Sequence, residues 1–181
     1  MTTHHDPAGT TVLVTGATGF IARHVVAQLL DAGYQVRGTA RRASSLDQLQ
    51  ADLAPHLADP GSAERLTIAA ADLTSDDGWA EAVAGCTYVH HVASPIPAAP
   101  PEDPNDLIVP ARDGTLRVLR AALDAGVSRV VLTSSLAAVL YGVDRTGKVF
   151  TEADWSNPDD RRIGAYVQSK TIAERAAWAF M

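Results

Sequence analysis

The residues best suited to acid–base chemistry are Tyr166 and Lys170, which lie four positions apart. Residues at this spacing share one face of a helix, so the phenol and the ammonium are expected to point the same way. A free phenol has a pKa near 10, and a neighbouring ammonium stabilises its ionised form. The pair is therefore a candidate proton donor with a tuning cation. The alternative is a solvated pair without a chemical role.

Three hydroxyl residues, Thr133, Ser134 and Ser135, lie at the end of a predicted strand at 129–133. One of these hydroxyls is positioned to hold a substrate carbonyl while Tyr166 protonates it. Capping of the turn after the strand is the structural alternative. No His, Cys, Asp or Glu spacing typical of a metal site accompanies them, and the chemistry needs no metal.

A glycine-rich turn, Thr15–Ala22 (TGATGFIA), separates a predicted strand at 10–15 from a predicted helix at 20–32. Its spacing is G-x-x-G-x-x-A. Small residues let the backbone approach a pyrophosphate, and the helix N-terminus offers unpaired N–H groups to it. The strand–turn–helix context favours a dinucleotide site over a plain tight turn.

The predicted second strand ends without the acidic residue that usually marks NAD binding, because residues 33–46 contain no Asp or Glu. Arg41 lies there instead, and a guanidinium suits a 2′-phosphate. NADP is therefore favoured, with NAD as the alternative. Arg42 is a second candidate, and Arg37 is expected on a sheet face. Asp72, after the third strand, is a candidate acceptor for the adenine amino group.

The wider pattern is an alternation of strands and helices. Five strands joined by helices predict a doubly wound parallel α/β sheet in the order 3-2-1-4-5. The chain is expected to be irregular at 95–104, where five prolines crowd together, and at 140–162. The predicted strands cover 10–15, 34–40, 66–71, 87–93 and 129–133, and the predicted helices cover 20–32, a segment capped by Ser44 or Ser45 that carries Leu46 to Leu57, 77–84, 114–125 and 166–180.

Composition limits the class of protein. The 181 residues are 46% hydrophobic and 20% charged, which predicts one domain at 10–181. The polar start at 1–9 is expected to be flexible, with His4 and His5 in a frayed terminus. The net charge of −6 argues against a nucleic-acid partner, and no segment is apolar over a bilayer-spanning length. The single cysteine, Cys86, suits a reducing cytoplasm.

The sequence resembles the extended short-chain dehydrogenase/reductase (NAD-dependent epimerase/dehydratase) family. Within it, the branch of dihydroflavonol 4-reductase, cinnamoyl-CoA reductase and aldehyde reductase is the most similar. The resemblance runs in family order across nearly the whole chain, in the stretches VTGATGFIARHVV, GYQVRGTARR, AADLTSDDGW, VHHVASP, VVLTSSLAAV, FTEADW and YVQSKTIAERAAW.

The resemblance implies a role for each matching position. Ser135, rather than Ser134, matches the catalytic serine, Tyr166 the proton donor and Lys170 its tuning cation, which would also hold a ribose hydroxyl. Hydride would pass from the nicotinamide to a ketone or aldehyde. The implied cofactor residues are Gly16, Thr18, Gly19, Phe20 and Ile21 at the pyrophosphate, Arg41 at the 2′-phosphate, Asp72 and Leu73 at adenine, and Val92, Ala93 and Ser94 beside the nicotinamide ribose.

Two departures from the family pattern stand out. Ala22 replaces the usual third glycine, which the close packing of helix and strand still permits. Family members are considerably longer, so the chain is interpreted as an amino-terminal fragment whose activity depends on absent substrate-binding walls. The family also implies that two copies pair into a homodimer.

Three functions are consistent with these residues. The leading one is an NADP-dependent reductase acting on a small-molecule carbonyl. A nucleotide-sugar epimerase or dehydratase shares the glycine turn and the Tyr–Lys pair. A non-catalytic NAD(P)-binding module has less need of Tyr166 and Lys170.

Overall fold

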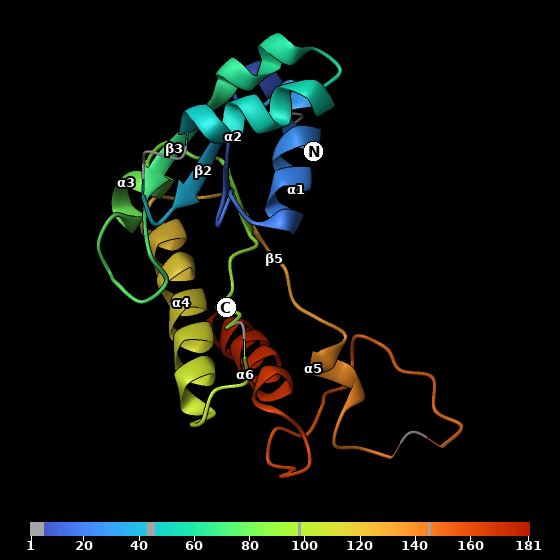
Figure 1. Cartoon of the computed structure of the whole chain (residues 1–181). Coiled ribbons are helices and arrows are strands. Elements are labelled where there is room, and N and C mark those ends of the chain that lie inside the picture. Colours follow the sequence, from blue (N-terminus) through green and yellow to red (C-terminus); the bar gives the residue numbers. More distant parts are fainter. Residues whose placement is uncertain (1–5, 43–45, 98, 145) are drawn as a thin grey trace. The chain divides into compact units, whose positions relative to one another are not determined.

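A five-stranded parallel sheet organises the chain, seen in a computed structural model that describes residues 6–42, 46–97, 99–144 and 146–181. Its strand order, β3-β2-β1-β4-β5, confirms the predicted topology. Figure 1 shows the strands with their crossover helices. The strands are β1 (Thr11–Val14), β2 (Gln35–Ala40), β3 (Leu66–Ala70), β4 (Tyr88–His91) and β5 (Arg129–Leu132). The predictions for His4, His5, Ser44 and Ser45 fall outside the described residues.

The helices follow the predicted alternation, with several short additions. The main helices are α1 (Phe20–Asp31), α2 (Leu46–Leu53), α3 (Trp79–Val83), α4 (Asn105–Asp124), α5 (Ala137–Leu140) and α6 (Ala165–Phe180). Short 3-10 helices lie at η1 (Pro7–Gly9), η3 (Ala54–His56) and η4 (Pro60–Arg65). The prediction that this helix extends to Leu57 was wrong, because α2 ends at Leu53 and Leu57 follows η3, where it is buried.

One face of the sheet carries the main apolar core. Val14 and Val36 from the strands pack with Val26 and Leu30 of α1 and with Leu49 of α2. All five side chains are at most 1% exposed. Near-continuous burial along β1 explains why this strand is so apolar, since parallel strands are covered on both faces.

On the opposite face of the sheet, an arginine of β2 contacts the end of α3. Alternation along β2 directs Arg37 away from the face that buries Val36. Its guanidinium donates to the carbonyl oxygens of Ala82, at 3.0 Å, and Ala84, at 2.7 Å, at the C-terminal end of α3. A cation at this end is favourable for the helix dipole. The expectation that Arg37 occupies a sheet face therefore agrees with its contacts, and Cys86 is buried nearby.

The predicted start of the fourth crossover helix was wrong. The sequence predicts a helix at 114–125, whereas α4 begins at Asn105 and passes through Pro110. Asp103 caps this start, because its Oδ1 accepts from the Asn105 N–H at 2.9 Å. Proline at 110 costs one backbone hydrogen bond, but the amphipathic face of a 20-residue helix keeps the segment helical. The described residues of 95–104 are irregular, as predicted.

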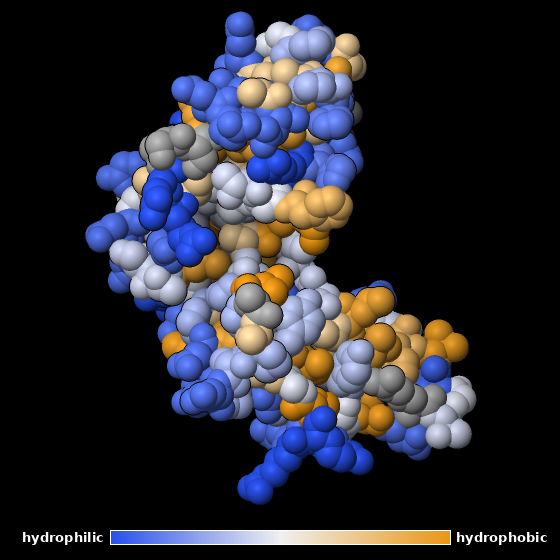
Figure 2. All heavy atoms as spheres, viewed as in Figure 1, coloured by the Kyte–Doolittle hydropathy of each residue, from blue (hydrophilic) through white to orange (hydrophobic). Residues whose placement is uncertain are grey.

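The chain divides into two compact units. The first contains residues 1–93 and 120–133, and therefore the whole sheet. The second contains residues 94–119 and 134–181, in which α5 packs on α6. Hydrophobic side chains reach the surface near α5 and the following loop (Figure 2), among them Leu136 and Val149. The extent of a single domain, 10–181, stays a prediction.

Within the described part of the chain, no helix combines the length and the apolar character needed to cross a membrane.

Candidate functional site

The glycine turn is joined to β2 by hydrogen bonds to Thr39. Gly16 has a φ of +66°, which favours glycine, and a Cβ placed there would lie 3.0 Å from the Ala93 Cβ. Thr39 accepts from the Ala17 N–H through its carbonyl and from the Gly16 N–H through its hydroxyl. Gly19 is the N-cap residue of α1, and no side chain caps the start of the helix. The first amides of α1 are thus available to an anion.

The turn is accessible from Thr18 onwards, as a ligand site requires. Thr18, Gly19, Phe20 and Ile21 are all exposed. Phe20 and Ile21, the first two residues of α1, are 81% and 56% exposed, which is high for apolar side chains. This exposure is compatible with contact to a bound molecule.

A buried hydroxyl joins the glycine turn to the end of β4. Thr15 Oγ1 accepts from the N–H groups of Val92, at 3.0 Å, and Ala93, at 2.9 Å. It also lies 2.8 Å from His91 Nδ1. With both lone pairs engaged, the hydroxyl hydrogen is directed at Nδ1, so this imidazole nitrogen accepts. Val92 and Ala93, two predicted cofactor residues, are thereby fixed beside Gly16.

Arg41 and Asp72 lie close enough to interact. Asp72 Oδ1 accepts from the Thr74 N–H at 2.8 Å and from the Thr74 hydroxyl at 2.7 Å. These bonds lower the pKa of Asp72, and the charge of Arg41 lowers it further. Asp72 is therefore an ionised acceptor at neutral pH, beside an exposed guanidinium. Leu73, the other predicted adenine residue, is half-buried.

The second unit carries the predicted acid–base pair on α6. Tyr166 lies in the first turn and is 42% exposed, whereas Lys170 is only 8% exposed. Lys170 Nζ lies 6.0 Å from the centroid of the Tyr166 ring. Burial lowers the pKa of Lys170 because desolvation disfavours the ammonium. The helix thus brings an accessible phenol and a buried amine together, as the spacing predicts.

The two serines after β5 differ in their partners. Ser135 Oγ accepts from the Ala137 N–H at 3.1 Å, at the start of α5. Its hydroxyl hydrogen is not used by this bond, so Ser135 can still donate to a substrate oxygen. Ser134 donates its own hydrogen to Glu174 Oε2. These contacts favour Ser135 over Ser134 as the hydroxyl that meets a substrate.

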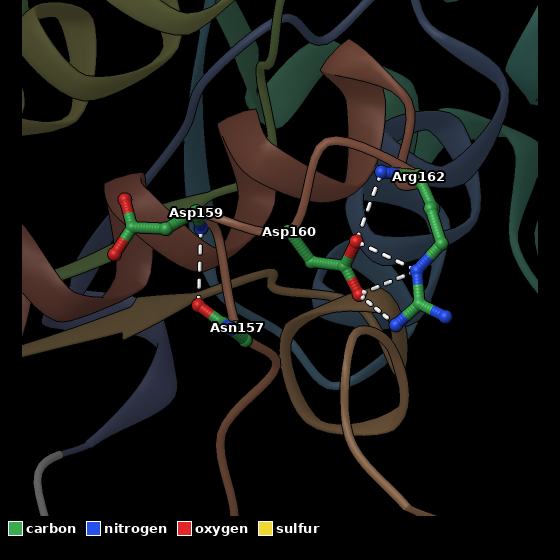
Figure 3. Close-up of polar contacts among 4 residues, drawn as sticks. All are labelled: Asn157, Asp159, Asp160 and Arg162. Carbon is green, nitrogen blue, oxygen red and sulfur yellow. Dashed lines mark hydrogen bonds and ion pairs between the residues drawn. The ribbon is translucent and has the colours of Figure 1, made fainter.

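The loop before α6 contains a local ion pair between Asp160 and Arg162. Asp160 accepts from the backbone and side chain of Arg162, including 2.6 Å between Oδ2 and the guanidinium (Figure 3). These bonds lower the pKa of Asp160 to about 2. Asn157 Oδ1 accepts from the Asp159 N–H in the same loop. This turn leads to Gly164, the residue before α6, which begins at Ala165.

The predicted residues fall into two sets along the chain. The residues predicted at the phosphates and adenine, together with Val92 and Ala93, belong to the first unit. Ser94, Ser135, Tyr166 and Lys170 belong to the second. Sequence reasoning missed Glu174, although it continues the four-residue spacing of Tyr166 and Lys170. Among the described residues, no group of three or more His, Cys, Asp or Glu is arranged to hold a metal ion.

A family model, curated relatives and a solved structure all match this chain. A model of the NAD dependent epimerase/dehydratase family matches residues 12–181. The chain is 37% identical to a dihydroflavonol 4-reductase of Zea mays and 41% identical to a cinnamoyl-CoA reductase 1 of Petunia hybrida, with 94% of the chain covered in each case. The yeast methylglyoxal/isovaleraldehyde reductase Gre2, solved in complex with NADPH, has a TM-score of 0.79 and 31% identity over 94% of this chain.

The matches cover most of this chain but only part of each relative. The aligned part is 48% of the maize protein, 50% of the petunia protein and 52% of the yeast structure. The chain therefore spans about half the length of the relatives it matches.

Proposed function

The chain belongs to the NAD dependent epimerase/dehydratase family, and from that premise we propose that it binds NADP and takes part in the reduction of a ketone or aldehyde to an alcohol. The observation that carries the proposal is the pairing on α6 of an accessible phenol, Tyr166, with a buried amine, Lys170. The reductase names of its relatives and the NADPH in the yeast structure support it.

The groups that fit a dinucleotide come from the first unit, with Ser94 of the second unit in addition. The uncapped start of α1 presents amides to the pyrophosphate, together with Gly16, Thr18, Gly19, Phe20 and Ile21. Arg41 would pair with the 2′-phosphate by forked hydrogen bonds. Asp72, ionised beside Arg41, would accept from the adenine amino group with Leu73 against the ring. Val92, Ala93 and Ser94 would line the nicotinamide ribose.

The second unit supplies the groups that act on the carbonyl. Bound NADPH provides a hydride from C4 of its nicotinamide. Ser135 would hold the substrate oxygen by donating its hydroxyl hydrogen, and Tyr166 would give its phenolic proton to that oxygen as the alcohol forms. Lys170, as an ammonium, would stabilise the phenolate left behind and bind a ribose hydroxyl. A cytoplasmic location, a homodimer and a small-molecule carbonyl substrate stay predictions.

Cofactor titration tests the proposal most directly. NADPH should bind the 181-residue chain more tightly than NADH by at least about tenfold, since a forked charged pair contributes on the order of 1.5–3 kcal/mol. Arg41→Ala should remove this preference. Arg37→Ala is the matched control, because Arg37 is held by α3. Equal affinities in the parent chain would contradict the NADP assignment.

A turnover assay tests the reaction class. NADPH consumption should appear with aromatic ketones and aldehydes and not with nucleotide sugars. Conversion of a nucleotide sugar in place of carbonyl reduction would instead identify an epimerase or dehydratase.

A further inference from the structure

We propose that Glu174 is a positioning residue, which fixes the Ser134–Ser135 turn to the helix that carries Tyr166 and Lys170. This inference rests on the proposed function and extends it to a residue outside the predicted set. It concerns the second unit alone, since all five residues belong there.

The contact that carries the inference joins distant parts of the chain. Ser134 lies 40 residues before Glu174, and its hydroxyl donates to Glu174 Oε2. Both side chains are half-buried, so the bond is partly shielded from water. A hydrogen bond to a carboxylate is stronger than a neutral one, and shielding strengthens it further.

Glu174 occupies a particular place on α6. It follows Lys170 by four residues and Tyr166 by eight, so the three side chains form one stripe along the helix. Its other oxygen, Oε1, lies 3.4 Å from Trp178 Nε1, one turn further on. The carboxylate is therefore oriented by its own helix on one side and receives the serine on the other.

The consequence reaches Ser135 through its neighbour. Holding the Ser134 side chain fixes the backbone on which Ser135 sits, and Ser135 Oγ in turn caps the Ala137 N–H. Ser156 secures the far side of the same segment, because its hydroxyl donates to the Ala137 carbonyl at 2.7 Å and accepts from the Tyr141 N–H at 2.8 Å. The Ser135 hydroxyl is thus held at a defined place relative to α6.

A positioning role differs from an electrostatic one in what it requires of residue 174. An acceptor oxygen is enough to hold Ser134, and glutamine supplies one without charge. Glu174→Gln should therefore preserve the arrangement, whereas Glu174→Ala should lose it. If the negative charge beside Lys170 were the important property, both variants would be impaired alike.

The first experiment needs no turnover. Amide hydrogen exchange at Ala137, followed by NMR, should accelerate by about tenfold in Glu174→Ala and in Ser134→Ala, because the Ser135 cap opens more often. Glu174→Gln should exchange like the parent chain. Glu64→Ala, at an exposed position of η4, is the control for loss of a carboxylate. Unchanged exchange in Glu174→Ala would overturn the inference.

The second experiment asks whether the positioning matters for the reaction. In a form of the protein with measured carbonyl reduction, Glu174→Ala should lower kcat by about tenfold or more while the KM for NADPH stays within about twofold, since a misplaced Ser135 affects the transition state and not cofactor binding. Glu174→Gln should restore kcat.

Failure of the proposed function and failure of the positioning role give different results. Absence of NADPH binding or of turnover in the parent protein would contradict the proposed function and leave the exchange result to decide the contact. A parent protein that turns over, with Glu174→Ala equally active, would overturn the positioning role alone. Loss of kcat in Glu174→Gln to the level of Glu174→Ala would also overturn it, in favour of charge.

Discussion

At the scale of single residues, the candidate site combines groups with opposite exposure. Tyr166 is accessible to a substrate, whereas Lys170 is buried beneath it on the same helix. A buried amine is costly to keep as an ammonium. A buried ammonium beside a phenol is expected where its charge contributes to activity, because groups that favour activity often lower stability.

Removing the phenolic hydroxyl should separate catalysis from binding. Tyr166→Phe should lower kcat for carbonyl reduction by about 10²–10⁴-fold, the usual contribution of a positioned acid, and leave NADPH affinity nearly intact. Steady-state kinetics and a parallel cofactor titration measure the two quantities. Turnover retained at the parent rate would remove Tyr166 from the role of proton donor.

Replacing the buried amine should stabilise the fold. Burial lowers the pKa of Lys170, so the folded chain binds this proton less tightly than the unfolded chain. The resulting cost is fully present below the lowered pKa and disappears as the pH rises to the unfolded value, about 10.4. Lys170→Met should therefore unfold at higher urea concentration than the parent at pH 7, although it loses turnover.

The pH dependence of that difference provides the check. The advantage of Lys170→Met should shrink as urea titrations are repeated from neutral pH towards pH 10. A variant less stable than the parent at pH 7 would show that the amine makes bonds that offset its desolvation.

At the scale of elements, the arginines of β2 and of the loop after it have separate tasks. Arg37 holds the end of α3, whereas Arg41 lies beside Asp72. Both residues are arginines, but strand alternation places the side chain of Arg37 on a face of the sheet and so distinguishes it from Arg41.

This division predicts distinct defects. Arg37→Met should lower the free energy of unfolding by about 1.5–3 kcal/mol, because the carbonyls of α3 lose a charged donor. Its preference for NADPH over NADH should not change. Denaturant unfolding and cofactor titration on the same sample decide the matter, and a variant that lost the preference without losing stability would assign Arg37 to the cofactor instead.

At the scale of the whole molecule, the alternation of apolar runs was sufficient to predict all five strands and their order. The glycine turn and the Tyr166–Lys170 pair were predictable because each depends on neighbours within a few residues. The start of α4 was not, because the local effect of proline was outweighed by the Asp103 cap and the amphipathic face that follows.

Contacts across long separations were also beyond prediction. Nothing within a few residues of Ser134 indicates Glu174, since the bond forms only once β5 and α6 have taken their places. The same holds for Thr15 and His91, which are 76 residues apart. Such pairs depend on tertiary structure and not on local propensity.

The saturated hydroxyl of Thr15 ties the choice of amino acid at one position to the choice at another. A valine at position 15 would keep the shape of the side chain, but the N–H groups of Val92 and Ala93 and the Nδ1 atom of His91 would all lose a hydrogen-bond partner. A substitution at position 15 therefore requires a compensating substitution at position 91. Transfer of the glycine turn into a related scaffold would therefore require Thr15 and His91 to be transferred together.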